Sequence, residues 1–240
     1  GSFYSFNELD YLIDPISPLI ICLTSYLIIT FFNFLFTELE RSKVRTAFSQ
    51  YLAPEMVSRL AESSESLKLG GEKKNMTFLF SDIRGFTAIS ESYKSNPEEL
   101  TELINKLLTV LSNEILDNAG TIDKYMGDCI MAFWNAPTDQ ENHTDLALKA
   151  SFDMEKALEE FNIEFQKQKG MELKIGIGIN TGECIVGNMG SEKRFDYTVL
   201  GDPVNLASRL EGQSGTYGFQ RILGQETVNA LKSNANLFEL

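Results

Sequence analysis

The chain has 240 residues, 43% of them hydrophobic, a length that predicts one sizeable core with a smaller appendage. Asp and Glu total 34 against 21 Lys and Arg, so the net charge of −13 repels the phosphate backbone of nucleic acids. We therefore expect no nucleic acid among its partners, whereas a nucleotide that carries magnesium ions is compatible with this charge.

Residues 16–37 are predicted to form a transmembrane helix that follows an extracytoplasmic remnant at residues 1–15. From Leu19 to Phe36 the sequence is uncharged and almost wholly apolar. Eighteen helical residues at about 1.5 Å each nearly cross a hydrocarbon layer of about 30 Å. A fully buried core helix is the alternative, but apolar residues on every face would then need protein all around them.

The charges on either side of this segment indicate its orientation. Acidic residues precede it, whereas a cleaved signal peptide would begin with basic ones, so we expect no cleavage. Basic residues mark the cytoplasmic flank of a span, and three of them follow this one at positions 41, 43 and 45. The sequence therefore predicts an inner or plasma membrane protein with a single span in this chain and a cytoplasmic catalytic domain.

Two short regions separate the span from the main domain. Residues 38–60 are predicted to be a connecting helix with one apolar side, interrupted at Pro54. This helix either carries a signal from the membrane or simply packs on the domain or on a twin helix. Residues 61–74 are rich in Ser, Gly and charge and are predicted to be a linker.

Residues 75–240 are predicted to form an α+β domain of ferredoxin-like type, an antiparallel sheet with helices. Asn96 and Pro97 give a helix start with a cap, and Gly120 is the expected stop. The periodicity predicts these elements: a strand at 75–80, a helix at 97–120, a hairpin at 121–134 with Met126 and Gly127 in its turn, a helix at 145–169, two strands at 173–190 around Thr181-Gly-Glu183, a short helix from Asp202, and a strand and helix at 222–232.

Two acidic residues stand where strands end. Asp82 follows the strand at 75–80, and Asp128 follows the turn of the hairpin. Because these strands are neighbours in a ferredoxin-like sheet, the two carboxylates can share cations, and Mg²⁺ prefers such oxygen ligands. Two ions about 3.5–4 Å apart would activate an attacking hydroxyl and stabilise a leaving oxygen. A single such Asp would be a solvated cap.

Several other side chains suit a phosphorylated ligand. Residues 85–87, Gly-Phe-Thr, would offer backbone N–H groups to phosphate oxygens. Asn205 and Arg209 are four apart on one helix face, where they can orient a sugar and neutralise a phosphoryl group. Lys124 is either a surface lysine or a donor to a base. The only histidine, His143, excludes Ser-His and multi-histidine sites and is interpreted as a solvated helix residue.

Together these segments resemble the class III nucleotidyl cyclase catalytic domain over roughly residues 70 to 240. The N-terminal span and helix also resemble bacterial membrane-bound adenylate cyclases. Four motifs in the order typical of the family carry the resemblance: Ser81-Asp-Ile-Arg-Gly-Phe-Thr87, Asp123-Lys-Tyr-Met-Gly-Asp128, Ile177-Gly-Ile-Asn-Thr-Gly182 and Tyr197 to Arg209.

The resemblance implies a role for each matching residue. Asp82, Asp128 and the carbonyl of Ile83 would bind two Mg²⁺ ions per site, for which Mn²⁺ can substitute. Lys124 and Thr198 would contact the purine. Two further residues would act on the rest of the nucleotide, Asn205 on the ribose and Arg209 on the transition state. The substrate-side residues would come from the second protomer of a head-to-tail homodimer with shared active sites.

The resemblance also implies a substrate. Guanylate cyclases of the family usually place Glu and Cys at the two purine positions, where this chain has Lys124 and Thr198. We therefore expect ATP to be the substrate and cyclic AMP and pyrophosphate the products, in intracellular signal transduction. Two departures from the family are Gly176, where many members have a basic residue, and the stop at Leu240, from which we expect a C-terminally incomplete catalytic domain.

Three alternatives remain open from the sequence. The domain could be a non-catalytic module that dimerises and relays conformation, although it keeps all the residues that catalysis needs. It could be a guanylate cyclase. A polymerase-like or diguanylate cyclase palm shares the paired acids, but its Gly-Gly-acid hairpin motif is absent at Met126-Gly-Asp128.

Overall fold

The structure is a computed structural model that describes residues 16–48, 70–191, 194–233 and 238–239. The chain forms two compact units, residues Gly1–Arg59 and Leu60–Leu240. Each unit is described by itself below.

The first unit contains one continuous helix, α2 (Ile16–Phe48). The window Leu19–Phe36 has a mean hydropathy of 2.2 and is long and apolar enough to cross a membrane, and its side chains are exposed. The hydroxyl of Thr24 donates to the carbonyls of Ile20 and Ile21, so this polar group is satisfied within the helix. The predicted span is thus helical, and the same helix continues through the first part of the predicted connecting segment. Pro54 lies outside the described residues.

The second unit is an α+β domain built on one sheet, as predicted. The strands run in the order β2-β3-β1-β4-β5, each antiparallel to its neighbours, and β6 pairs in parallel with β4. The strands are β1 (Gly70–Ile83), β2 (Thr121–Met126), β3 (Cys129–Trp134), β4 (Ile175–Ser191), β5 (Arg194–Leu200) and β6 (Arg221–Leu223). The helices are α4 (Phe86–Ser92), α5 (Pro97–Asp117), α6 (His143–Lys169), α7 (Asp202–Tyr217) and α8 (Gln225–Ala230).

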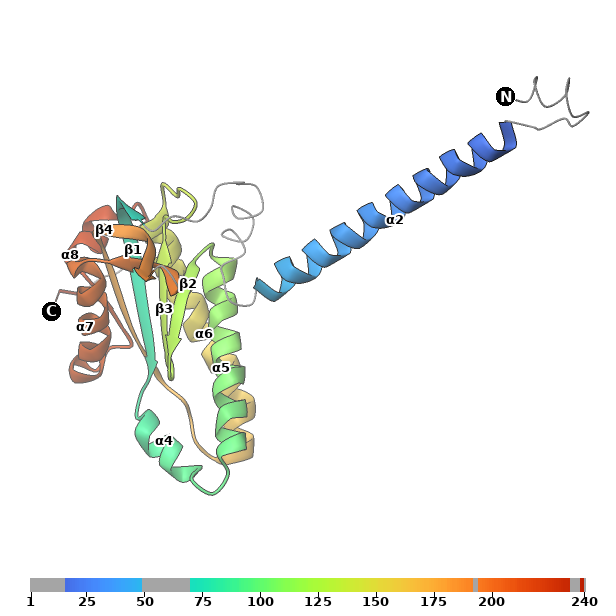
Figure 1. Cartoon of the computed structure of the whole chain (residues 1–240). Helices are drawn as coiled ribbons and strands as arrows, with labels where there is room; N and C mark the ends of the chain where they lie inside the picture. Colours follow the sequence, from blue (N-terminus) through green and yellow to red (C-terminus); the bar gives the residue numbers. More distant parts are fainter. Residues whose placement is uncertain (1–15, 49–69, 192–193, 234–237, 240) are drawn as a thin grey trace, which may run out of the picture. The chain divides into compact units, whose positions relative to one another are not determined.

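The sheet lies between two layers of helix, with α5 and α6 on one side and α7 on the other (Figure 1). Alternate residues of each strand supply the two cores, because successive side chains of a strand point to opposite faces. Leu79 of β1 packs with α5 and α6, and Phe78 and Phe80 pack with α7. Asp82 continues the second series, so the strand directs it to the α7 side.

The strand β5 was not predicted, and three further differences from the sequence prediction concern β1, β4 and α4. β1 begins at Gly70, so the last five residues of the predicted linker are strand, held by pairing with β4 from Asn188 to Cys184. β4 is one strand of 17 residues rather than two. Its Gly182 is required not by a turn but by packing, because a Cβ there would lie 2.6 Å from Cγ of Pro203. The third difference is α4, a seven-residue helix that was not predicted.

The start of α5 is confirmed and its end is shifted. Asn96 accepts a hydrogen bond from the Glu99 amide, as expected of an N-cap. The helix ends at Asp117, and Ala119 rather than Gly120 takes the left-handed conformation, with φ of 56°. Gly120 is needed for space, since a Cβ would meet the Trp134 ring at 2.7 Å.

His143 begins α6 and is half-buried, so its interpretation as a solvated residue is wrong. Its Nδ1 lies 2.7 Å from the Thr77 hydroxyl of β1, which lies 2.9 Å from the Thr181 hydroxyl of β4. Thr227 of α8 donates to Thr181 over 3.0 Å. Burial lowers the pKa of His143 and keeps the ring neutral. The four side chains form a hydrogen-bonded network that joins α6 and α8 to the sheet.

Candidate active site

The carboxylates of Asp82 and Asp128 converge on one backbone amide. The N–H of Ile83 donates to Asp82 Oδ1 over 3.0 Å and to Asp128 Oδ2 over 3.3 Å. Asp82 reaches this point from the end of β1, and Asp128 from the turn between β2 and β3, where Met126 pairs with Cys129. The sheet therefore brings together the two acids that the sequence singled out.

This pair of acids carries more negative charge than its surroundings balance. Burial and the neighbouring Asp82 raise the pKa of Asp128 to about 6. Glu211 of α7 joins the same cluster, and burial followed by the charge of Asp82 raises its pKa to about 7, although Arg84 opposes this rise. Cys129 is also affected, with a pKa of about 12, because of burial and the Asp82 charge. A cation is what such a cluster favours.

Two glycines of β4 let α7 approach the acids. A Cβ on Gly178 would lie 2.2 Å from the carbonyl oxygen of Ala207 and 2.2 Å from the amide nitrogen of Glu211. A Cβ on Gly176 would lie 2.7 Å from Glu211 Oε1, and Gly176 is the strand partner of Asp82. At Gly178 only glycine fits, because a Cβ would overlap backbone atoms of α7, whereas at Gly176 the close atoms belong to the side chains of Glu211 and Ser214. Glu211 was not identified from the sequence. It could have been found from its position two residues after Arg209, on the side of the same helix that faces the sheet.

Arg84 ties the loop after β1 to the far end of α7. Its guanidinium donates to the Ile175 carbonyl, to the Ser214 hydroxyl and to the Phe219 carbonyl. Its backbone amide donates to the carbonyl of Lys174 over 2.8 Å. Arg84 is thus committed to protein groups, and it holds the chain at the point where Asp82 and Ile83 must be placed.

The predicted phosphate turn forms the start of α4. Gly85 has a φ of 68°, a left-handed conformation that glycine adopts without strain, and it precedes the first helical residue, Phe86. Phe86 packs against the core under α5 and α6, and Thr87 is exposed. The carbonyl of Gly85 accepts from the amides of Ala88 and Ile89 at 3.0 and 3.3 Å. The amides of Phe86 and Thr87, in the first turn, have no intrahelical acceptor.

The predicted purine residues lie on β2 and β5. Lys124 is 44% exposed at its side chain, and its Nζ lies 3.2 Å from Oδ2 of Asp123, whose side chain is only 1% exposed. Burial raises the pKa of Asp123, while the hydroxyl of Thr198 and then the charge of Lys124 lower it. Lys124 and Thr198 therefore act on one buried carboxylate. The sequence analysis quoted Asp123 within a motif but gave it no role.

Asn205 and Arg209 are exposed on α7, four residues apart. Val204 and Ala207 face the sheet, so Asn205 and Arg209 point to another side of the helix. An apolar side chain of the same helix, Leu206, is also exposed. This surface combines a ligand-binding type of pair with unburied apolar area.

The donor set suits a magnesium ion that keeps other oxygen ligands. Within the ranges that the structure describes, no group of three or more His, Cys, Asp or Glu side chains is placed to hold a metal ion. The described site thus offers two carboxylates, Asp82 and Asp128, while the Ile83 carbonyl stays a prediction from the sequence. Mg²⁺ is typically bound by one or two carboxylates together with waters and substrate phosphates.

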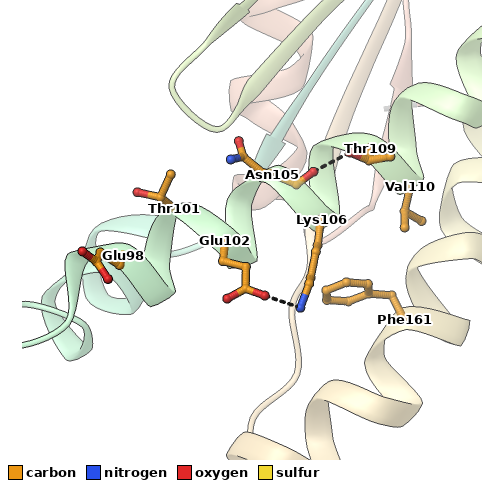
Figure 2. A pocket seen from close by; sticks show the side chains of 8 residues that line it. All are labelled: Glu98, Thr101, Glu102, Asn105, Lys106, Thr109, Val110 and Phe161. Atoms are coloured by element: carbon orange, nitrogen blue, oxygen red, sulfur yellow. Dashed lines mark hydrogen bonds and ion pairs between the residues drawn. The ribbon is translucent and has the colours of Figure 1, made fainter.

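A groove of about 750 Å³ lies elsewhere, on the outer side of α5 (Figure 2). Seven of the side chains that line it belong to α5, and Phe161 comes from α6. Glu102 and Lys106 form an ion pair of 2.7 Å along the helix. None of the predicted site residues lines this groove, so we do not assign the chemistry to it.

Comparison with known proteins covers most of the chain. Residues 70–240 match the family "Adenylate and Guanylate cyclase catalytic domain". The chain is 35% identical over 195 residues to an adenylate cyclase of Anabaena cylindrica, which covers 79% of this chain and 38% of that protein. It is 36% identical over 172 residues to adenylate cyclase 1 of Rhizobium meliloti, over 71% of this chain and 25% of that protein. The chain thus spans well under half of these relatives.

Solved structures give the same result for the fold. The crystal structure of the guanylyl cyclase Cya2 has a TM-score of 0.62 and 39% identity, over 69% of this chain and 82% of that one. The adenylyl cyclase CyaB from P. aeruginosa has a TM-score of 0.61 and 38% identity, over 68% of this chain and 82% of that one. Enzymes named for either nucleotide are therefore equally similar to this chain.

Proposed function

Because the chain belongs to the adenylate and guanylate cyclase catalytic domain family, we propose that it is a membrane-tethered adenylate cyclase that converts ATP to 3′,5′-cyclic AMP and pyrophosphate. The observation that carries this proposal is the convergence of Asp82 and Asp128 on the Ile83 amide, beneath a helix that bears Asn205 and Arg209. A domain that only relayed conformation would gain nothing from two repelling carboxylates in one place.

The residues of the chain have distinct tasks in this reaction. Asp82, Asp128 and the Ile83 carbonyl would hold two Mg²⁺ or Mn²⁺ ions, which when bound lower the pKa of an attacking hydroxyl and polarise phosphoryl oxygens. The ribose 3′-hydroxyl loses its proton to solvent, a bond forms between its oxygen and the α-phosphorus, and the bond from that phosphorus to the pyrophosphate oxygen breaks. The first-turn amides of α4, at Phe86 and Thr87, would donate hydrogen bonds to phosphate oxygens.

Two residues of α7 would act on the nucleotide from the side opposite the metal ions. Asn205 would orient the ribose, so that its 3′-hydroxyl lies in line with the leaving pyrophosphate. Arg209 would donate to the phosphoryl oxygens as their charge grows, and its guanidinium stays charged at any working pH. Lys124 and Thr198 would hold the purine.

We further propose that two copies of the chain form a homodimer in which each site is shared. Exposure of Asn205 and Arg209, together with the unburied Leu206 on the same helix, supports a second protomer at this surface. The apolar window of α2 supports attachment to a membrane. Basic residues after this window favour a cytoplasmic catalytic domain.

Guanylate cyclase activity is the second candidate, and the 39% identity to a guanylyl cyclase favours it. Lys124 and Thr198 favour ATP instead. The deciding experiment measures cyclic AMP from ATP and cyclic GMP from GTP, each with Mg²⁺ and with Mn²⁺. Predominant cyclic AMP supports the proposal, predominant cyclic GMP reverses the substrate, and a folded dimer without product would make the domain a relay module.

A further inference from the structure

A β-bulge changes the direction of side chains at the start of β2. The pairing of β2 with β3 runs from Ile122 opposite Ala132 to Lys124 opposite Met131, so Asp123 has no partner of its own. Successive side chains of a regular strand point to opposite faces. Here Asp123 Oδ2 and Lys124 Nζ lie 3.2 Å apart, so the bulge has brought two successive residues together.

The Asp123 carboxylate is buried without a satisfying set of hydrogen bonds. Its side chain is 1% exposed, and in the part of the chain that the structure describes neither oxygen has a hydrogen bond of normal geometry. Its neighbours are Lys124 and, across from β2, the hydroxyl of Thr198 on β5. Burying a carboxylate this way costs free energy, and its local partners repay only part of it. Such a cost calls for a functional explanation.

Contacts between the strands explain how β5 reaches this carboxylate. The rings of Phe133 on β3 and Tyr197 on β5 lie 6.4 Å apart, on the face of the sheet that α7 covers. Tyr197 precedes Thr198, and Thr121 of β2 is the strand partner of Phe133. The fold therefore places the beginning of β2 near the middle of β5, although the two strands are not paired.

A threonine hydroxyl beside a carboxylate can take only one hydrogen-bonding role toward it, that of donor. The hydroxyl of Thr198 can donate one hydrogen bond and accept others, whereas a carboxylate only accepts. When the proton of Thr198 points to Asp123, the lone pairs of the same oxygen remain for a ligand. Thr198 then presents an acceptor and Lys124 a donor.

We propose that Asp123 is a positioning residue that takes the hydrogen bond of the Thr198 hydroxyl and thereby fixes Thr198 as an acceptor, which selects adenine over guanine. This inference rests on the proposed function, because it requires Lys124 and Thr198 to face the purine. Adenine carries an amino group, a donor, at the position where guanine carries a carbonyl, an acceptor. An accepting Thr198 matches the first and leaves the second without a donor.

The test compares the parent chain in detergent with the variants Asp123→Asn and Asp123→Ala. The first keeps the size of the side chain and removes the charge, and the second removes the acceptor entirely. We measure the affinities for the α,β-methylene analogues of ATP and GTP, and kcat and KM for both nucleotides. We expect the preference for ATP to fall about tenfold in Asp123→Ala and less in Asp123→Asn, mainly through KM.

A double-mutant cycle separates positioning from direct contact. If Asp123 acts through Thr198, then Asp123→Ala changes the preference less than about twofold once Thr198→Val is present. Asp196→Asn is the matched control, since this exposed carboxylate of β5 acts on Asp123 only through its charge. We expect it to leave the preference unchanged.

Each outcome decides the matter. A preference unchanged in both Asp123 variants overturns the inference, and so does an equal effect in the Thr198→Val background, which would make Asp123 a direct reader of the base. A parent that forms no cyclic nucleotide overturns the proposed function alone, because the analogue affinities still report the selection. A parent that binds neither analogue overturns both.

Discussion

Two regions of the β1–β4 strand pair differ in whether their polar side chains have enough hydrogen-bond partners. In the middle, Thr77 and Thr181 face each other and pass their hydrogen bonds on to His143 and Thr227, so that every hydroxyl has a partner. At the end of β1, Asp82 competes with Asp128 for one amide. The comparison teaches that saturated polar groups hold this domain together, whereas unsaturated ones mark where a cation or a nucleotide would bind.

The largest expected effect removes one acid of the unsaturated region. Asp82→Ala should lower product formation by about 10²–10³-fold or more, because metal ions supply several kcal/mol of transition-state stabilisation. The melting temperature should stay the same or rise, since a repelling charge is lost. Asp117→Ala, an exposed aspartate at the end of α5, is the control. Turnover equal to that of the parent would exclude the metal assignment.

A second substitution addresses the exposed arginine of α7. Arg209→Ala should lower kcat by about 10²-fold and change KM much less, because its charge is needed mainly while the phosphoryl group transfers. Steady-state kinetics with ATP measures this, and Arg194→Ala, at the start of β5, is the matched control. An effect on KM alone would make Arg209 a residue that binds the ground state.

The saturated region should respond in the opposite manner. Thr77→Val keeps the shape of the side chain but removes the hydroxyl partner of His143 and one of the two partners of Thr181, so the free energy of unfolding should fall by about 1–3 kcal/mol. The kcat and the ATP preference should stay within about twofold. Denaturant unfolding measures the first quantity, with the exposed Thr109→Val as control. A large loss of kcat with little loss of stability would refute the division between the two regions.

The smallest expected effect is a pH dependence. The pKa of Asp128, about 6, and that of Glu211, about 7, lie above their unfolded values, so the metal-free fold binds more protons than the unfolded chain between about pH 4 and 7. These groups therefore lower stability as pH rises through that window. A bound cation favours the charged forms, so the gain in melting temperature on adding Mg²⁺ should grow from pH 5 to pH 8.

The control for this titration is Glu211→Gln, which should flatten the upper part of the curve. Melting temperatures in EDTA and in Mg²⁺ at each pH provide the measurement. A magnesium effect that is independent of pH would show that the acids do not bind the ion.

Most elements of the fold could be predicted from periodicity, and the elements that could not have physical reasons. Asn96 could be identified as a cap because the cap chemistry is local. Gly182 looked like a turn residue, but its role depends on Pro203, which is distant in sequence. The seven residues of α4 are too few to show a helical period. Features set by local sequence were thus predicted well, whereas features set by packing between distant segments were not.

The same division holds for the site. Asp82 and Asp128 were found because both end strands, and the sheet topology that joins them could be inferred. Asp123 and Glu211 were missed because the bulge in β2 and the close approach of α7 to Gly176 and Gly178, neither of which periodicity reveals, direct their carboxylates.

Gly178 has a mechanical consequence. With the carbonyl of Ala207 and the amide of Glu211 only 2.2 Å from where a Cβ would stand, α7 packs backbone to backbone against β4 at this point. We expect helix and sheet to move together, so that Arg209 keeps a nearly constant position with respect to Asp82 of its own chain. In the proposed homodimer, control of the shared site would then act through the angle or spacing between whole protomers.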